Sequence, residues 1–176
     1  MTNQQRIQDL MRNGSLDIIL KLFTNLIGKE ALDDKAGGYF TIQYLDELNT
    51  VISKKVGKIP PEKIDKYSCL SKEKPSRLKR NLSLGHMTSY ESRNPDAEIF
   101  ITTGIVEPWG HWGGAVLISK KFIFSFSGFP ELVDEAFVCF LGIKSGLMSK
   151  CQFGIVKKRR SDNPYLDLIH QSLIQK

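Results

Sequence analysis

The sequence predicts an α+β fold in which an antiparallel sheet is flanked by helices and preceded by a helical N-terminal extension. Residues 115–118 and 122–127 are rich in β-branched and aromatic side chains, and a short polar turn separates them, which predicts a hairpin. A helix is expected directly afterwards, because Pro130 suits a first helical turn and residues 131–141 are largely apolar. In the first third of the chain, apolar residues recur instead at the three- and four-residue spacing of helices.

The N-terminal part is expected to be helical throughout. Residues 7–11 carry the apolar spacing of a first helix, and Ser15 is placed to cap a second helix that ends at Gly28. Residues 40–56 repeat apolar side chains at near-helical intervals, which predicts a third helix. The prolines at 60–61 suit the start of a short fourth helix.

One domain with three parts is expected. Residues 1–70 form a helical region packed on the sheet, residues 71–97 a basic connecting segment, and residues 98–176 the strand-rich core. The further elements expected in this core are strands at 98–103 and 152–156 and a C-terminal helix at 165–174 capped by Ser161 or Asp162.

Composition narrows the class of protein. Hydrophobic residues make up 41% of the chain and charged residues 25%, which is typical of a globular domain. No apolar stretch approaches the ~20 residues of a membrane span, and the N-terminus lacks the apolar core of a signal peptide. The three cysteines are scattered and are expected to be reduced thiols. These features predict a cytoplasmic protein with no membrane partner.

The first candidate site is the loop that precedes the hairpin. Trp109, His111 and Trp112 stand among glycines that include Gly113 and Gly114. Tryptophan rings stack on flat or cationic groups, glycines let a ligand approach the backbone, and histidine can bind metal or move a proton near neutral pH. The alternative is a tight loop of packed aromatic side chains in which His111 is only hydrogen-bonded in place.

The second candidate site is the turn between the hairpin and the following helix. Ser127 and Gly128 stand where a strand ends and a helix begins, so free backbone N–H groups there could hold an acidic group. Ser127 is predicted either to contact the ligand or to serve as the N-cap of the helix, and the N-cap is the favoured alternative.

Basic clusters explain much of the net charge of +6. They lie at residues 72–80 and 157–160 and could bind a phosphate-bearing partner, although solvated loops are the favoured interpretation. Nucleic acid is an unlikely partner for them, because neither cluster interleaves with aromatic residues. A metal shared by His86, His111 and Glu107 is not supported by their spacing, so no metal site is predicted.

Part of the chain, residues 77–146, resembles the GlcG/HbpS-type heme-degrading-like domains. The resemblance is carried by a basic segment at 77–80, a Gly-Gly entry into a strand at 113–118, the run Ser-Gly-Phe-Pro at 127–130 and an acidic helix start at 134–136. It implies a profilin-like α/β sandwich. Heme or another planar acid is compatible with the candidate residues.

The function predicted from these features is a small-molecule-binding or sensory/adaptor domain that takes a planar acidic ligand such as heme. Its ligand-binding residues would be Trp109, His111, Trp112, Gly113, Gly114, Ser127 and Gly128. One alternative is an enzyme, a hydrolase or lyase, that uses His111 as its general base. Another is a nucleic-acid or protein interaction module that uses the basic clusters. Pairing of exposed sheet edges could also produce a homo-oligomer.

Overall fold

The computed structural model describes residues 1–45, 50–83, 90–91, 114–118 and 121–175. Its helices are α1 (Asn3–Met11), α2 (Ser15–Ile27), α3 (Ile64–Ser83), α4 (Glu131–Lys144), α5 (Lys150–Arg159) and α6 (Pro164–Ile174), with short 3-10 turns η1 (Glu30–Leu32) and η2 (Pro61–Lys63). Its strands are β1 (Ala36–Tyr44), β2 (Val51–Lys58), β3 (Tyr90–Glu91), β4 (Ala115–Ile118) and β5 (Phe122–Ser127).

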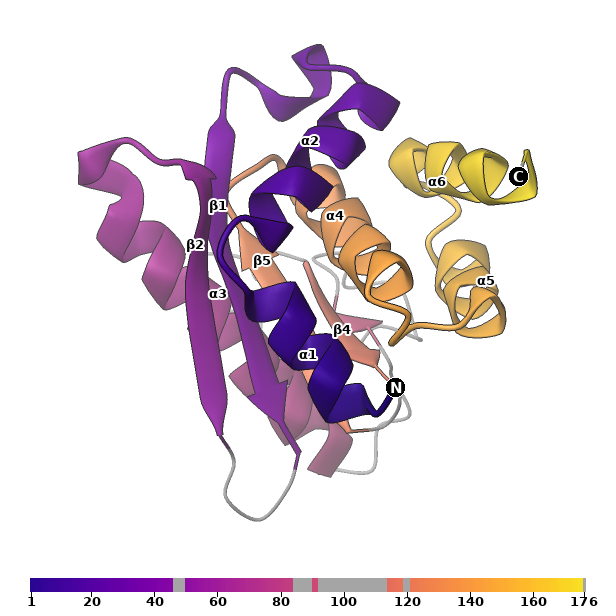
Figure 1. Cartoon of the computed structure of the whole chain (residues 1–176), viewed down its shortest axis with the longest axis horizontal. Helices are drawn as coiled ribbons and strands as arrows, with labels where there is room; N and C mark the ends of the chain where they lie inside the picture. The colour runs from indigo at the N-terminus through magenta and orange to yellow at the C-terminus, as the bar shows by residue number, and fades with distance from the viewer. Residues whose placement is uncertain (46–49, 84–89, 92–113, 119–120, 176) are drawn as a thin grey trace.

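The strands form one antiparallel sheet in the order β2-β1-β5-β4-β3. One face of the sheet is covered by α1, α2 and α4, with α5 and α6 packed beyond α4, and α3 crosses the opposite face (Figure 1). The predicted α+β class, with an antiparallel sheet flanked by helices and a helical N-terminal part, is therefore confirmed.

Strand β5 divides its side chains between the two faces, as the period of two requires. Phe122, Phe124 and Phe126 point into the main core, where Phe126 meets Phe137 of α4 with ring centroids 4.8 Å apart. The alternate residues Ile123, Ser125 and Ser127 face α3, where they are also buried. The second face is thus a partly polar interface.

Hydrogen bonds near the proline within α3 hold this helix on the polar face of the sheet. Pro75 has no N–H group, so the carbonyl of Ser71 loses its helical donor. The hydroxyl of Ser125 donates a hydrogen bond to that carbonyl instead, and Thr41 of β1 donates to the Ser71 hydroxyl at 2.9 Å. These bonds fix the position of α3 along the sheet, which brings Lys74 over the end of β5.

The predicted helix at residues 40–56 is wrong, because this segment contains most of the β1–β2 hairpin. The spacing of apolar residues resembled that of a helix because β1 is buried on both faces. Its side chains are apolar on the face toward the main core and partly polar on the face toward α3. Phe40 and Ile42 enter the main core, whereas Thr41 and Gln43 are equally buried beneath α3. A strand covered on both faces lacks the alternation of buried and exposed residues that identifies a half-buried strand.

Four further expectations also need correction. Residues 71–83 belong to α3 and not to a connecting loop, and residues 152–156 lie in α5 and not in a strand. The N-cap of α2 is Gly14, one residue before Ser15, and the C-cap is Gly28 as predicted. The N-cap of α6 is Asn163, whose side chain accepts from the Tyr165 N–H at 3.1 Å, so neither Ser161 nor Asp162 caps it. The strand predicted at 98–103 lies outside the described residues.

Candidate functional site

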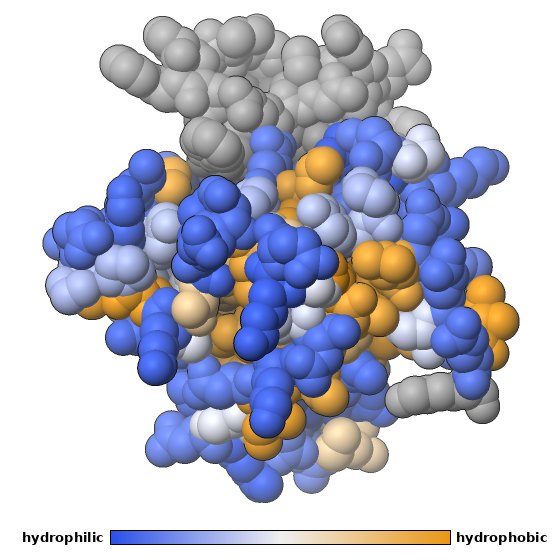
Figure 2. Space-filling model, turned by 90° about the horizontal axis from the view of Figure 1, so that it is seen from above, coloured by the Kyte–Doolittle hydropathy of each residue, from blue (hydrophilic) through white to orange (hydrophobic). Residues whose placement is uncertain are grey.

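A pocket of about 290 Å³ lies between the first half of α3 and the turn that joins β5 to α4. We call it the lysine pocket. Its lining residues are Lys35, Lys63, Lys66, Tyr67, Leu70, Lys74, Ser127, Gly128, Phe129 and Asp134. Figure 2 shows the molecule from the top of the view in Figure 1, the end at which β1 begins and β2 ends. On this face hydrophilic side chains surround smaller apolar areas. The volume is close to the lower end of the range typical of small-molecule sites.

The inner end of the lysine pocket is a buried ion pair. Lys74 Nζ lies 3.0 Å from Asp134 Oδ2, and the two side chains are only 1% and 5% exposed. Lys74 also donates a hydrogen bond to the Phe126 carbonyl, and Asp134 Oδ1 accepts one from the Phe129 N–H at 2.8 Å. The pair therefore connects α3, the end of β5, the turn and α4.

Burial controls the protonation of Asp134. Loss of solvent raises the pKa of this carboxyl from 3.8 to about 6, and the cation of Lys74 and the N–H groups of Phe129 and Gly128 act in the opposite direction. The desolvation effect is the larger one, so the carboxyl changes charge near neutral pH. A shifted titration of this kind is frequent at functional sites, although structural ion pairs produce it too.

Gly114 lies against the ion pair. Its φ of 106° belongs to the region that favours glycine, and a Cβ atom there would lie 2.9 Å from the Asp134 Cβ and 3.1 Å from Lys74 Nζ. Gly128 is equally constrained, because a Cβ atom would come within 2.5 Å of the Gly37 carbonyl oxygen. Both glycines were predicted as site residues, and both leave room for neighbouring groups at the pocket.

Ser127 is 4% exposed and faces the pocket from the end of β5. Within the described part of the chain its hydroxyl takes part in no hydrogen bond. It does not cap α4, because the N-cap position is Pro130 and no side chain caps that end. The favoured N-cap role is therefore wrong, and a contact from Ser127 to a ligand stays a prediction.

The turn amides do not have the role expected of them. The sequence predicted that N–H groups near Gly128 would be free for the acidic group of a ligand. Instead, Asp134 supplies that acidic group from within the chain, since its carboxylate accepts from the Phe129 N–H. Positive charge that is free to meet a ligand lies at the outer part of the pocket, on Lys63 and Lys66.

These two lysines differ from the other cations of the pocket. Both are exposed where η2 leads into α3, and among the described side chains neither is in an ion pair with a carboxylate. Lys35, by contrast, lies 3.3 Å from Asp33, and Lys74 is paired with Asp134. The outer part of the pocket therefore carries two positive charges that no carboxylate of the described residues pairs with.

Four predicted site residues, Trp109, His111, Trp112 and Gly113, lie outside the described residues, as do His86 and Glu107. The other three, Gly114, Ser127 and Gly128, are gathered around the Lys74–Asp134 pair. The sequence analysis missed the lysines, because Lys74 stands in a basic run that resembles a solvated segment. Its neighbour Lys72 is exposed as expected.

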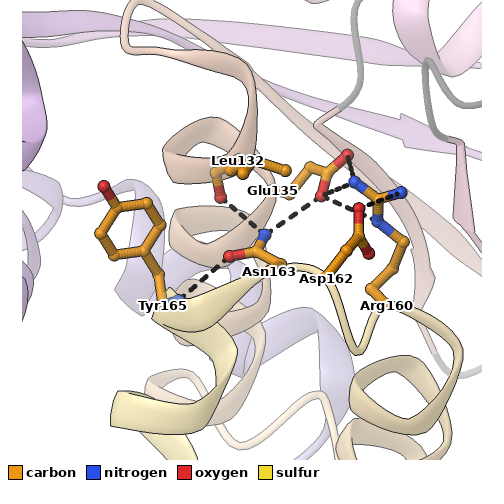
Figure 3. Close-up of polar contacts among 6 residues, drawn as sticks. All are labelled: Leu132, Glu135, Arg160, Asp162, Asn163 and Tyr165. Atoms are coloured by element: carbon orange, nitrogen blue, oxygen red, sulfur yellow. Dashed lines mark hydrogen bonds and ion pairs between the residues drawn. The ribbon is translucent and has the colours of Figure 1, made fainter.

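A second buried polar network joins α4 to the C-terminal helices (Figure 3). Arg160 makes contacts of 3.0–3.2 Å with both carboxylate oxygens of Glu135, and the two side chains are 3% and 0% exposed. Asn163 adds bonds to Glu135 at 3.1 Å and to the Leu132 carbonyl at 2.8 Å, while Arg160 also contacts Asp162 at 3.2 Å.

This network changes the interpretation of two residues of the basic cluster at 157–160. Arg160 is buried and neutralised by Glu135, and Lys157 lies 2.8 Å from Asp167. Charge that is already paired attracts a polyanion weakly, so these two residues contribute little to a nucleic-acid interface.

Neither a metal centre nor a membrane helix is found in the part of the chain that the structure describes. No group of three or more His, Cys, Asp or Glu side chains there could hold a metal ion. No helix there combines the length and apolar character needed to cross a bilayer.

Comparison of the chain with protein-family models, curated proteins and solved structures found no match. The residues of the lysine pocket, with their distances and charges, are the observations from which a function can be proposed.

Proposed function

We propose that this chain is a small-molecule-binding domain that takes a compact acidic ligand in the lysine pocket. One observation carries the proposal: Lys63 and Lys66, which are exposed and pair with no described carboxylate, border a pocket that the hydroxyl of Ser127 faces. This hydroxyl has no hydrogen-bond partner in the described chain, so it can bond to a ligand in the pocket. The lysines supply the attraction for an acid.

The size of the pocket bears on the nature of the ligand. About 290 Å³ is close to the lower end of the range for small-molecule sites, which favours a ligand smaller than the heme macrocycle. The GlcG/HbpS-type resemblance supports a ligand-binding role for the same turn and helix, and heme remains one candidate within it. A sensory or adaptor role is favoured over an enzymatic one if binding occurs without turnover.

Reversing the charge of Lys66 is expected to weaken acid binding at least tenfold. The wild-type chain and the Lys66→Glu variant are titrated by calorimetry with a panel of small carboxylates and phosphate esters. A carboxylate at this position repels an anionic ligand, and about 1.4 kcal/mol corresponds to each factor of ten in affinity. Hemin is included in the panel and followed by its Soret absorbance.

The matched control is Lys72→Glu, which reverses an exposed charge on the same helix outside the pocket. Its affinity for each acid should stay within about twofold of the wild type. The proposal is contradicted if no acid in the panel binds the wild type, or if both charge reversals weaken binding equally. A hemin complex with a shifted Soret band that tolerates Lys66→Glu would place the ligand site elsewhere.

A further inference from the structure

We infer that the acidic ligand of the lysine pocket is a phosphate monoester, with its dianionic phosphate between Lys63 and Lys66 and a compact, largely apolar body directed inward. This inference rests on the proposed function and specifies its ligand class. It follows from the distribution of charge along the pocket, from the type of cation present, and from the character of the inner lining.

The charge distribution favours a dianion at the outer part of the pocket. Lys63, at the end of η2, and Lys66, in the first turn of α3, stand three residues apart, and both are exposed and line the pocket. Lys35 is compensated by Asp33 at 3.3 Å. The acidic residues Glu62 and Asp65 are next to the two lysines in sequence but do not line the pocket. Two uncompensated charges are matched by one group that carries two negative charges.

The type of cation is compatible with phosphate, and the number of cations favours it over a single carboxylate. Every cation in the described lining is a lysine, and none is an arginine. The lysine ammonium binds phosphate as a point charge, and a phosphate monoester brings two negative charges and three outer oxygens in one group, whereas one carboxylate brings a single charge. A phosphate can accept from both ammonium groups at once.

The inner lining favours a neutral, mainly apolar body. Tyr67, Leu70 and Phe129 supply ring and aliphatic surface. At the inner end, the Lys74–Asp134 pair is neutral as a unit, and the turn amide of Phe129 is already bonded to Asp134 Oδ1. In the described lining, a second anionic group would therefore find the hydroxyls of Ser127 and Tyr67 as its uncharged side-chain donors. An otherwise apolar body with one or two polar atoms is the complement of this surface.

The inference is tested by calorimetry with five probes at pH 8, where a phosphate monoester is fully dianionic. Phenyl phosphate combines the dianion with a ring, benzenesulfonate and benzoate carry one charge on the same ring, phthalate carries two carboxylates, and inorganic phosphate lacks the ring. Phenyl phosphate is expected to bind at least tenfold more tightly than each of the other four.

Charge-neutral variants locate the phosphate. Lys63→Gln and Lys66→Gln should each weaken phenyl phosphate binding about tenfold and bring it close to the affinity of benzenesulfonate. Ser127→Ala should weaken it less, and Lys72→Gln should leave it unchanged. The three lysines are exposed, so their replacement should leave the fold intact, and circular dichroism melts of each variant check this.

The outcomes separate the inference from the proposed function. If phthalate or benzoate binds as tightly as phenyl phosphate, the ligand class is wrong while acid binding in the pocket stands. If inorganic phosphate binds as tightly as phenyl phosphate, the apolar body is wrong. If none of the five probes binds, both the inference and the proposed function are overturned.

Discussion

Replacing Arg160 by methionine is expected to lower the free energy of unfolding by about 3–5 kcal/mol, the usual cost of removing one partner from a buried ion pair. Glu135 is 0% exposed, and its carboxylate would keep only the bond from Asn163 among those that Figure 3 draws. The loss is measured by urea or guanidinium unfolding at pH 7, with the midpoint and slope determined together.

Two further variants separate burial from simple loss of charge. Lys157→Met removes a partly exposed pair with Asp167 and should cost less than about 1 kcal/mol. The double variant Arg160→Met/Glu135→Leu should recover most of the lost stability, because no buried charge is left without a partner. A loss in Arg160→Met no greater than in Lys157→Met would show that the network does not hold the C-terminal helices in place.

Asp134 is expected to make the stability of the wild type fall as the pH rises from about 4 to about 7. Its folded pKa of about 6 lies above the ordinary value of 3.8, so the folded state binds this proton more tightly than the unfolded state. The stabilising contribution is therefore present below pH 4 and is lost as the pH passes through 6. With about 1.4 kcal/mol for each pKa unit, the loss amounts to about 3 kcal/mol.

The measurement compares wild type with Asp134→Asn, which cannot titrate, so that other ionisable groups cancel in the difference. The free energy of unfolding of the wild type minus that of the variant should fall by about 3 kcal/mol between pH 4 and pH 8. In Lys74→Met, where the cation that lowers the pKa of Asp134 is absent, the fall should move to higher pH. A difference that is constant with pH, or that rises, contradicts the burial argument.

The elements that were predictable from the sequence are those in which local preference and tertiary packing agree. The β4–β5 hairpin and α4 are one example, because β5 is rich in aromatic residues and α4 begins directly after Pro130. The segments that were predicted wrongly depend on contacts with residues that are distant in the sequence. Pro75 indicates a loop when considered alone. It is tolerated within α3 because Ser125 bonds the carbonyl of Ser71, which proline leaves free and which lies 54 residues earlier in the chain than Ser125.

The candidate site could be predicted in part for the same reason. The turn at 127–128 and Gly114 carry local signals, namely a strand end, a helix start and a run of glycines. The pairing of Lys74 with Asp134 spans 60 residues, and no spacing rule links two residues so far apart. Lys63 and Lys66 join the site only because α3 is fixed along the sheet by its polar face.

Amide chemical-shift mapping shows whether the lysine pocket binds small acids. The ¹⁵N-labelled chain is titrated separately with phenyl phosphate and with phthalate, and saturable shifts are expected, concentrated at residues 63–70 and 127–134. An absence of shifts with both acids, or shifts concentrated on α5 and α6, would show that the pocket does not bind small acids.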